Sequence, residues 1–336
     1  MSGRSILVTG ATGGLGKALV QEALERGHRV RASGRSTAAG EALTALGASF
    51  APCDLEHPKA DLKALVQGCD SVIHAAALSA SWGPRAAFVS ANVEATEALL
   101  AAAREAGMRR FVFVSSPSIY ARLHHQPDLT EDDPPNPKPL NWYAQTKRDA
   151  EQAVLAQSDE ILACCAIRPR ALVGPGDRVI LPRLADLASR QRLPLPGGGR
   201  ALIELTDLRD AAWAICEAEE RAQTLSGRAI NISGGQPVEV RAVARAVAQA
   251  LGKEPRLVPL PLGLARVLAE AMERVAKAAG AKAEPLLTRY SLATLGFSQS
   301  FDLTRAHSDL GYSPRHDALQ TLCEQARTLA GQGGNP

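Results

Sequence analysis

The sequence predicts an α/β fold in which a doubly wound parallel sheet is followed by a smaller, mainly helical lobe. Three observations predict it. Short apolar runs alternate with helical patterns through the first half of the chain, an alternation that is typical of parallel sheets. The first apolar run breaks into a glycine-rich turn that leads into a helix. Beyond residue 177 the regular alternation decays, which indicates a second lobe.

Composition narrows the class of protein. The 336 residues carry a net charge of +3, with 22% charged and 4% aromatic residues, which describes a globular protein and excludes a disordered one. This charge is too small and dispersed to indicate a nucleic-acid partner.

The six cysteines form no C-x-x-C pair, which favours buried thiols in a reducing compartment. The first strand leaves no room for a signal peptide, and no apolar run reaches the roughly 20 residues of a membrane span. We therefore expect a cytoplasmic protein.

The glycine turn joins a strand at residues 5–9 to a helix that begins near residue 17. Its G-x-x-G-x-x-G spacing allows a sharp turn and a close backbone approach to a ligand, whereas three glycines alone could mark only a tight turn. Strand, turn and helix in this order predict a Rossmann-type dinucleotide site, with a pyrophosphate at the helix start. The expected contacts of this turn with the cofactor are Gly10, Thr12, Gly13, Gly14, Leu15 and Gly16.

The end of the second strand, at residues 28–33, predicts the choice of cofactor. A carboxylate there would bind the adenosine ribose of NAD, but the chain offers Ser33, Arg35 and Ser36. A guanidinium with nearby hydroxyls can hold the extra phosphate of NADP. We therefore expect NADP(H), with NAD(H) left open; the alternative is that Arg35 is a solvated loop charge.

The third and fourth strands, at residues 48–51 and 69–77, supply further cofactor contacts. Asp54 follows the third strand and could accept from the adenine amino group or cap the next helix. Small residues end the fourth strand and would let the cofactor cross the strand tips: Ala75, Ala76 and Ala77. His74 in the same run is interpreted as a core histidine. Asn92, within a helix expected over 85–105, is interpreted as a buried structural hydrogen-bonding residue.

A fifth strand over 110–116 ends on two serines, and a proline-rich loop over 117–140 follows it. We expect this loop to be irregular and functional. It contains His124 and His125, but no further ligands at matching spacing indicate a metal site.

The helix over 141–155 places Tyr143 and Lys147 on one face. Reduction of a ketone by hydride needs a proton donor beside the carbonyl oxygen, and a phenol can serve. Lys147 would stabilise the phenolate, and a pKa lowered by about 3 units corresponds to roughly 4 kcal/mol. Ser116 would orient the same oxygen, so the predicted catalytic group is Ser116, Tyr143 and Lys147. The alternative, a chance Tyr and Lys pair, is disfavoured by the preceding turn and serines.

The remaining chain predicts the division into lobes. We expect a dinucleotide-binding core over 1–170 with returning segments near 201–232, and a substrate-binding lobe over 171–200 and 233–336. The apolar region 257–279 is expected to be helical, forming a lid or a dimer face rather than a membrane contact. A homodimer is expected.

These motifs resemble those of the extended short-chain dehydrogenase/reductases, a superfamily of NAD-dependent epimerases and dehydratases. The resemblance covers essentially the whole chain and rests on residues 9–16, 54–55, 74–77, 116, 143–147, 168–169, 174–177, 302–305 and 310–314. It implies an adenine contact at Asp54 and Leu55, and a nicotinamide site next to Pro169. Residues 116–120, 287–290 and the apolar tail look closest to the 3β-hydroxysteroid dehydrogenase-like branch, which includes bacterial 2-alkyl-3-oxoalkanoate reductases.

The predicted function is therefore NADP(H)-dependent reduction of a ketone on a hydrophobic substrate, either a β-keto acid or a sterol-like compound. Two alternatives stay open at this point. One is a sugar-nucleotide epimerase or dehydratase, against which the aliphatic run 255–271 argues. The other is a non-catalytic NADP(H)-sensing protein, although such proteins typically lack the tyrosine or the lysine.

Overall fold

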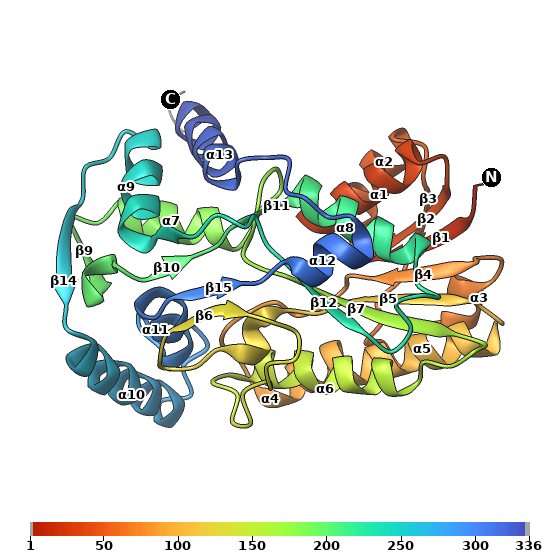
Figure 1. Cartoon of the computed structure of the whole chain (residues 1–336), viewed down its shortest axis with the longest axis horizontal. Coiled ribbons are helices and arrows are strands. Elements are labelled where there is room, and N and C mark those ends of the chain that lie inside the picture. The colour runs from red at the N-terminus through yellow and green to blue at the C-terminus, as the bar shows by residue number, and fades with distance from the viewer. Residues whose placement is uncertain (1–2, 333–336) are drawn as a thin grey trace.

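A seven-stranded parallel sheet forms the centre of the computed structural model, which describes residues 3–332 (Figure 1). Its strand order is β12-β7-β5-β4-β1-β2-β3, and every neighbouring pair is parallel. The strands are β1 (Ser5–Thr9), β2 (Arg29–Gly34), β3 (Ser49–Pro52), β4 (Ser71–His74), β5 (Arg110–Val114), β7 (Ala163–Pro169) and β12 (Ala229–Ile232). The predicted Rossmann-type fold is confirmed.

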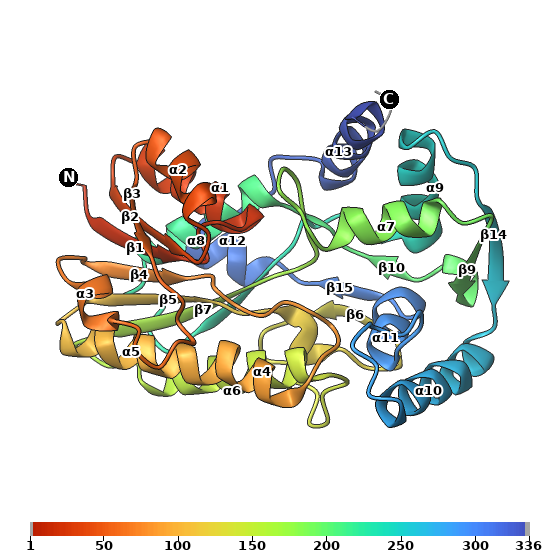
Figure 2. The ribbon, with the colours of Figure 1, turned by 180° about the vertical axis from the view of Figure 1, so that it is seen from behind.

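Helices cover both faces of this sheet, as Figures 1 and 2 show. One face carries α1 (Gly14–Glu25), α2 (Thr37–Ala45) and α8 (Leu208–Glu220); the other carries α3 (Leu62–Val66), α5 (Ala95–Glu105) and α6 (Trp142–Ala156). Alternate residues of β1 enter the two layers, because Ile6 and Val8 pack with α1 and Leu7 packs with α5. Full burial of each such side chain contributes about 1.5–3 kcal/mol.

The second lobe has its own apolar cluster and small sheets. The cluster includes Val173, Leu195, Val243 and Leu322. The largest of three small sheets has the strand order β13 (Val238–Glu239), β10 (Leu202–Ile203), β15 (Gln299–Phe301) and β6 (Gln126–Leu129). The other two sheets are strand pairs: β8 (Leu172–Val173) with β11 (Thr206–Asp207), and β9 (Arg192–Pro196) with β14 (Arg256–Leu260). The helices are α7 (Ile180–Ala188), α9 (Val240–Ala250), α10 (Leu262–Ala278), α11 (Arg289–Gly296), α12 (Thr304–Leu310) and α13 (Ala318–Gln332).

Two expectations about local structure are wrong. The loop over 117–140 is not wholly irregular, because it contains a 3₁₀ turn at Pro117–Tyr120 and strand β6, which pairs with β15 near the other end of the chain. The region 257–279 is not helical throughout, because its first residues belong to β14. Pro259 and Pro261 prevent a helix before Leu262, and Pro261 stands at the N-cap of α10.

The helix expected over 85–105 is interrupted at its centre. It consists of α4 (Arg85–Val89), a π-helical turn at Ser90–Glu94, and α5. Asn92 is buried within this turn. Single π-helical turns of this kind are frequent at functional sites.

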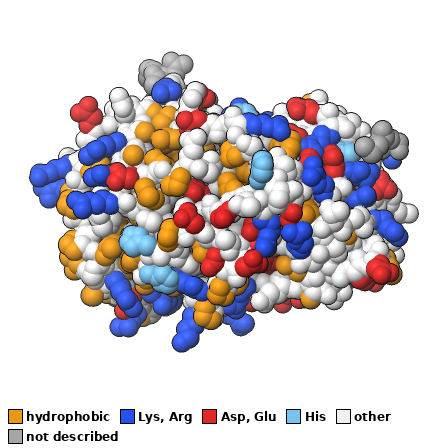
Figure 3. All heavy atoms as spheres, viewed as in Figure 1, with side chains coloured by type: hydrophobic (Ala, Val, Ile, Leu, Met, Phe, Trp, Pro, Cys, Tyr) orange, Lys and Arg blue, Asp and Glu red, His pale blue; other side chains and the backbone are white. Residues whose placement is uncertain are grey.

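The outer face of α10 carries exposed apolar side chains: Leu264, Val267, Leu268 and Val275. In Figure 3, apolar and basic side chains are interspersed over this corner of the molecule. Across residues 3–332, no helix combines the length and the apolarity that crossing a bilayer requires.

Candidate active site

The glycine turn between β1 and α1 forms a cradle that side chains would fill. A Cβ atom on Gly10, whose φ is +67°, would lie 2.7 Å from the Ala76 nitrogen, and one on Gly14 would lie 2.7 Å from the Gly176 oxygen. Gly16 is packed more tightly still, because its Cβ would lie 2.1 Å from the Gly10 oxygen. No side chain caps the start of α1, so the amides of its first turn have no side-chain acceptor among the described residues. These features fit the pyrophosphate of a dinucleotide.

The residues expected to select the cofactor lie at the end of β2. Arg35 is 74% exposed, and its Nη1 lies 3.8 Å from Glu56 Oε1. The Ser36 hydroxyl accepts a hydrogen bond from Ala39 N at 3.2 Å and caps α2, whereas Ser33 is buried within β2. Of the three, Arg35 is the one that carries a charge, and its guanidinium lies at the surface.

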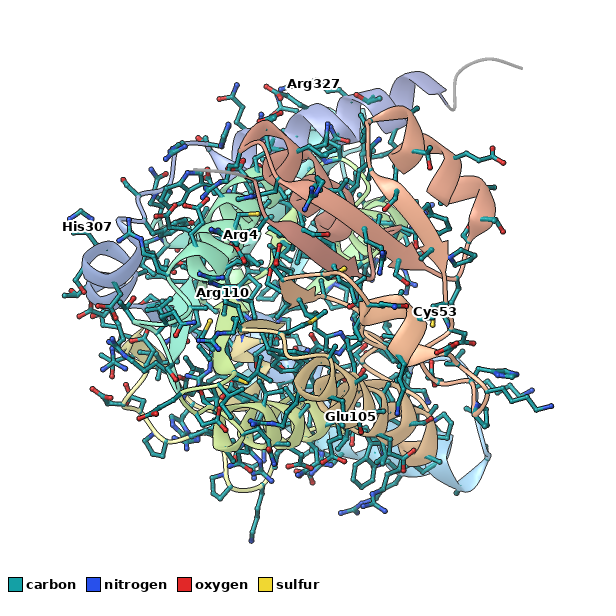
Figure 4. The ribbon with its side chains drawn as sticks, turned by 90° about the vertical axis from the view of Figure 1, so that its right-hand side faces the viewer. Arg4, Cys53, Glu105, Arg110, His307 and Arg327 are labelled. Carbon is teal, nitrogen blue, oxygen red and sulfur yellow. The ribbon has the colours of Figure 1, made fainter. Side chains whose placement is uncertain are left out.

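The residues expected around the adenine follow Cys53, which Figure 4 labels beyond the end of β3. Asp54 Oδ1 accepts from Glu56 N at 3.3 Å. The alternative that Asp54 caps the next helix is wrong, because Asp61 caps α3 by accepting from Ala64 N at 2.9 Å. Leu55 packs against the apolar cluster below the sheet. Of the alanines after β4, Ala75 and Ala76 are partly buried and Ala77 is exposed.

His74 is a core histidine, as predicted. Its side chain is 0% exposed, and its two ring nitrogens lie 2.7 Å from Thr9 Oγ1 and 2.9 Å from Thr96 Oγ1. Burial, together with the charge of Lys147, lowers the pKa of His74 to about 3. The ring is therefore neutral at physiological pH.

Helix α6 and the end of β5 bring the predicted catalytic group together. The Asn141 side chain accepts from Ala144 N at 2.8 Å and caps α6, which fixes the start of the helix next to Tyr143. Ser116 follows β5, and its hydroxyl accepts from Ser118 N at 3.2 Å. Lys147 is 2% exposed, and its Nζ donates to the carbonyl oxygen of Val114 at the end of β5.

The pKa of Tyr143 is raised in the structure, whereas the sequence led us to expect a lowered pKa. Burial raises the pKa of Tyr143 to about 12, the Ser116 side chain opposes this rise, and the charge of Tyr290 adds to it. Burial lowers the pKa of Lys147 to about 7, against the opposing effect of Glu151. The lysine hydrogen-bonds the Val114 carbonyl, and its Nζ lies 4.0 Å from the centroid of the Phe113 ring. Burial therefore dominates both pKa values.

Asn92 has a wider role than its sequence context indicated. Its Oδ1 accepts from Leu78 N at 2.7 Å, and its Nδ2 donates to Leu78 O at 3.2 Å and to Thr146 Oγ1 at 3.0 Å. The predicted buried hydrogen bonding is confirmed. These bonds join the loop after β4 to helix α6, so the π-helical turn supports the helix that carries Tyr143 and Lys147.

Sequence reasoning missed Arg170 and the position of Tyr290. Arg170 is buried directly after β7, and its charge acts on Tyr290, whose charge in turn acts on Tyr143. The sequence did offer one signal for Arg170. It is the second arginine at the end of a strand predicted to be buried, and arginines are seldom buried without a partner. Of the two histidines of the loop, His125 has a structural contact, because its Nδ1 accepts from Ser298 N at 2.9 Å, just before β15.

Comparison with known proteins adds to this geometry. A family model described as the NAD dependent epimerase/dehydratase family matches residues 6–233. A 2-alkyl-3-oxoalkanoate reductase of Stenotrophomonas maltophilia (strain K279a) is 36% identical over 315 residues, which cover 92% of this chain and 94% of that protein. The 4-hydroxy-2-methyl-3-oxo-4-farnesyl-3,4-dihydroquinoline-1-oxide ketoreductase of Stigmatella aurantiaca is 33% identical over 331 residues, covering 98% of each chain.

A solved structure is also similar over nearly the whole fold. MoeE5 in complex with UDP-glucose and NAD has a TM-score of 0.73 at 27% identity, with 97% of this chain and 99% of that chain covered. The similarity therefore extends through both lobes.

Proposed function

The chain belongs to the NAD dependent epimerase/dehydratase family, and from this premise we propose that it reduces a ketone on a hydrophobic substrate with NADPH. It is an enzyme, an NAD(P)-dependent oxidoreductase, which sets aside the non-catalytic alternative. One observation carries the proposal: Tyr143 and Lys147 of α6 stand with Ser116 at the carboxyl edge of the sheet, where the glycine cradle also opens.

The residues proposed to hold the cofactor are those of the glycine turn and of the strand ends that follow it. The amides at the start of α1 would bind the pyrophosphate, and Arg35 would bind the extra phosphate of NADP. When bound, the reduced nicotinamide supplies the hydride for the carbonyl carbon. The preference for NADP(H) is part of the proposal, supported by the exposed guanidinium at the end of β2.

Tyr143 is proposed to give its phenolic proton to the carbonyl oxygen. A pKa of about 12 keeps this proton on the phenol at every working pH, so the group is ready to act as an acid. Ser116 would donate a hydrogen bond to the same oxygen and orient it. The Lys147 ammonium, one helical turn away, would stabilise the phenolate that forms.

The substrate proposed is small and hydrophobic. The names of the two relatives support this, since one reduces an oxoalkanoate and the other a farnesylated ketone. A sterol-like ketone is the other hydrophobic class that the sequence indicates, and relatives named 3β-hydroxysteroid dehydrogenase support it. The homodimer, the cytoplasmic location and the substrate-binding role of the second lobe stay predictions.

A sugar-nucleotide epimerase is the second candidate function. The observation that favours it is the similarity to MoeE5, whose solved complex holds UDP-glucose and NAD. Thermal unfolding in the presence of UDP-glucose or of a long-chain β-keto acid, each with NADP⁺, separates the two functions. A rise in Tm with UDP-glucose alone would favour the epimerase.

The test of the proposed function is Tyr143→Phe. We expect kcat for ketone reduction to fall about 10²–10⁴-fold, because the proton donor is lost. NADPH binding, measured by the fluorescence of the bound cofactor, should be unchanged.

Trp142→Phe is the matched control, because Trp142 precedes Tyr143 on the same helix and its side chain is exposed. Its activity should equal that of the wild type. Measuring the wild type with NADPH and with NADH tests the cofactor preference. Full turnover by Tyr143→Phe would refute the proposed role of the tyrosine.

A further inference from the structure

Two arginines are buried at the carboxyl end of β7, and in the part of the chain that the structure describes only Arg168 forms an ion pair. Arg168 donates to both carboxylate oxygens of Glu151, at 2.8 and 2.5 Å, and to the Tyr120 hydroxyl. Arg170 is 8% exposed, yet within residues 3–332 its guanidinium has no hydrogen-bond acceptor and no ion-pair partner, and its Nε is fully enclosed. An unpaired buried charge is strongly destabilising. The Arg170 guanidinium is therefore available to an anion from outside the described chain.

No acid of the described chain supplies this anion. Glu204 is the buried carboxylate whose charge acts on Arg170. However, its Oε2 accepts from the Ser233 hydroxyl and its Oε1 accepts from Phe301 N at 3.4 Å. Burial raises the pKa of Glu204, while these two hydrogen bonds and the charge of Arg170 oppose the rise. Both carboxylate oxygens of Glu204 therefore accept hydrogen bonds from other groups, one in β15 and one in the residue after β12.

Tyr290 connects Arg170 to the catalytic tyrosine. Burial raises the pKa of Tyr290, while the charges of Arg170 and Arg183 lower it. The charge of Tyr290 in turn raises the pKa of Tyr143, after the larger effect of burial. Tyr290 thus lies within electrostatic range of both residues. Arg183 differs from Arg170, because its Nη1 lies 3.4 Å from Glu284 Oε2. The strand register agrees, because Val114 of β5 is level with Ile167 of β7 and Ser115 N donates to Ile167 O at 2.7 Å. Arg170 therefore follows the strand end that lies beside Ser116.

We propose that Arg170 binds the carboxylate of the substrate, so that the ketone reduced beside Tyr143 belongs to a free β-keto acid. This inference rests on the proposed function and makes its substrate class specific. The forked guanidinium matches a carboxylate with two parallel hydrogen bonds. In a β-keto acid one carbon separates the carboxylate from the ketone, so both groups fit one small site. A neutral sterol ketone would leave Arg170 unpaired. The phosphates of the cofactor are assigned to the start of α1 and to Arg35.

The test compares a 2-alkyl-3-oxoalkanoic acid, hydrolysed from its ester just before use, with its methyl ester, in wild type and Arg170→Met. We expect kcat/KM of the wild type to favour the acid by at least about 30-fold, the size of effect seen when a buried charge-paired contact is lost. In Arg170→Met the acid should lose about this factor, mainly through KM, and the ester should change less than about threefold. Arg245→Gln, an exposed arginine on α9, is the matched control and should match the wild type.

Thermal unfolding provides a second measurement that is independent of turnover. Arg170→Met should unfold at the same temperature as the wild type or higher, because an unpaired buried charge is removed. The corresponding 3-hydroxy acid with NADP⁺ should raise the Tm of the wild type and not that of the variant. UDP-glucose is included to distinguish a diphosphate from a carboxylate, and an Arg170-dependent shift with UDP-glucose alone would overturn the proposal.

The outcomes separate this inference from the function on which it rests. No reduction of acid or ester by the wild type would refute the proposed function itself. Tyr143-dependent reduction of both compounds at equal efficiency, or an equal loss for both in Arg170→Met, would refute only the carboxylate assignment.

Discussion

At the scale of single residues, the buried ammonium of Lys147 has the greatest consequence for chemistry. Its Nζ donates to the Val114 carbonyl, and its charge lies 4.0 Å from the Phe113 ring centroid. These contacts do not outweigh the loss of hydration, and the pKa of Lys147 falls to about 7. The lysine is therefore charged below neutral pH and becomes neutral above it.

This pKa predicts how ketone reduction depends on pH. As the pH rises from 7 to 9 the ammonium loses its proton, and the phenolate forming on Tyr143 loses its stabilising charge. We expect kcat to fall by up to about tenfold per pH unit over this range. The measurement is the pH profile of kcat with saturating NADPH and substrate.

Lys147→Met supplies the comparison for this profile. The variant should be slow and should show no fall between pH 7 and 9, because it has no ammonium to lose. A wild-type profile that stays flat from pH 6 to 9 would contradict the role given to the lysine.

At the scale of elements, the π-helical turn at Ser90–Glu94 connects the loop after β4 to helix α6. Asn92→Ala would leave Leu78 N and Thr146 Oγ1 without their present partner. Each buried group left unsatisfied costs about 1–3 kcal/mol, so Tm should fall by roughly 5 °C. We also expect kcat to fall about tenfold, because α6 loses an anchor next to its catalytic face.

Glu94→Ala is the control for this element, since Glu94 is exposed in the same turn. Its Tm and kcat should be those of the wild type. If Asn92→Ala also keeps both values, the Asn92 hydrogen bonds do not support α6.

Some strands could be predicted from the sequence because their own residues show the pattern of a buried strand. Others could not, because they form only by pairing with a strand that is distant in the sequence. Strands such as β5 and β7 are continuous apolar runs buried on both faces, and this pattern alone predicts them. Strand β6, with the sequence Gln-Pro-Asp-Leu, shows no such pattern and exists because β15 pairs with it. β14 reads as part of an apolar helix until its prolines are weighed.

In the candidate site, too, some residues could be predicted from the sequence and others could not. Tyr143 and Lys147 could be found because their spacing places them on one helical face. The two arginines after residue 167 look alike in sequence, and only the position of Glu151 on α6 distinguishes the paired Arg168 from Arg170. The direction of the Tyr143 pKa was also beyond sequence, because it depends on burial.

At the scale of the whole molecule, a polar contact joins the loop after β4 to the second lobe. The Ser81 hydroxyl donates to Glu284 Oε2 at 2.6 Å, and Trp82 Nε1 donates to Ala281 O at 3.0 Å. On the other side of the same loop, Asn141 Nδ2 donates to Ser81 O at 3.3 Å, next to the start of α6. The two lobes therefore meet beside the helix that carries Tyr143.

Glu284→Ala should weaken this junction, because the carboxylate accepts from both Ser81 and Arg183. We expect KM for the hydrophobic substrate to rise about tenfold with a smaller change in kcat, and hydrogen exchange to increase over 78–83 and 281–288.

Glu270→Ala, which removes a surface ion pair with Arg266 on α10, serves as the control and should change neither quantity. Unchanged exchange in both segments of Glu284→Ala would show that the Glu284 carboxylate does not hold these segments together.

The pairing of β6 with β15 has a consequence for how the protein is made. β6 follows Ser116 by ten residues, yet its partner strand occupies positions 299–301. During synthesis, the residues of β6 are therefore made long before those of β15, with which they pair. A chain that ended before residue 299 would therefore lack the partner strand of β6, although Ser116, Tyr143 and Lys147 all lie upstream of that point.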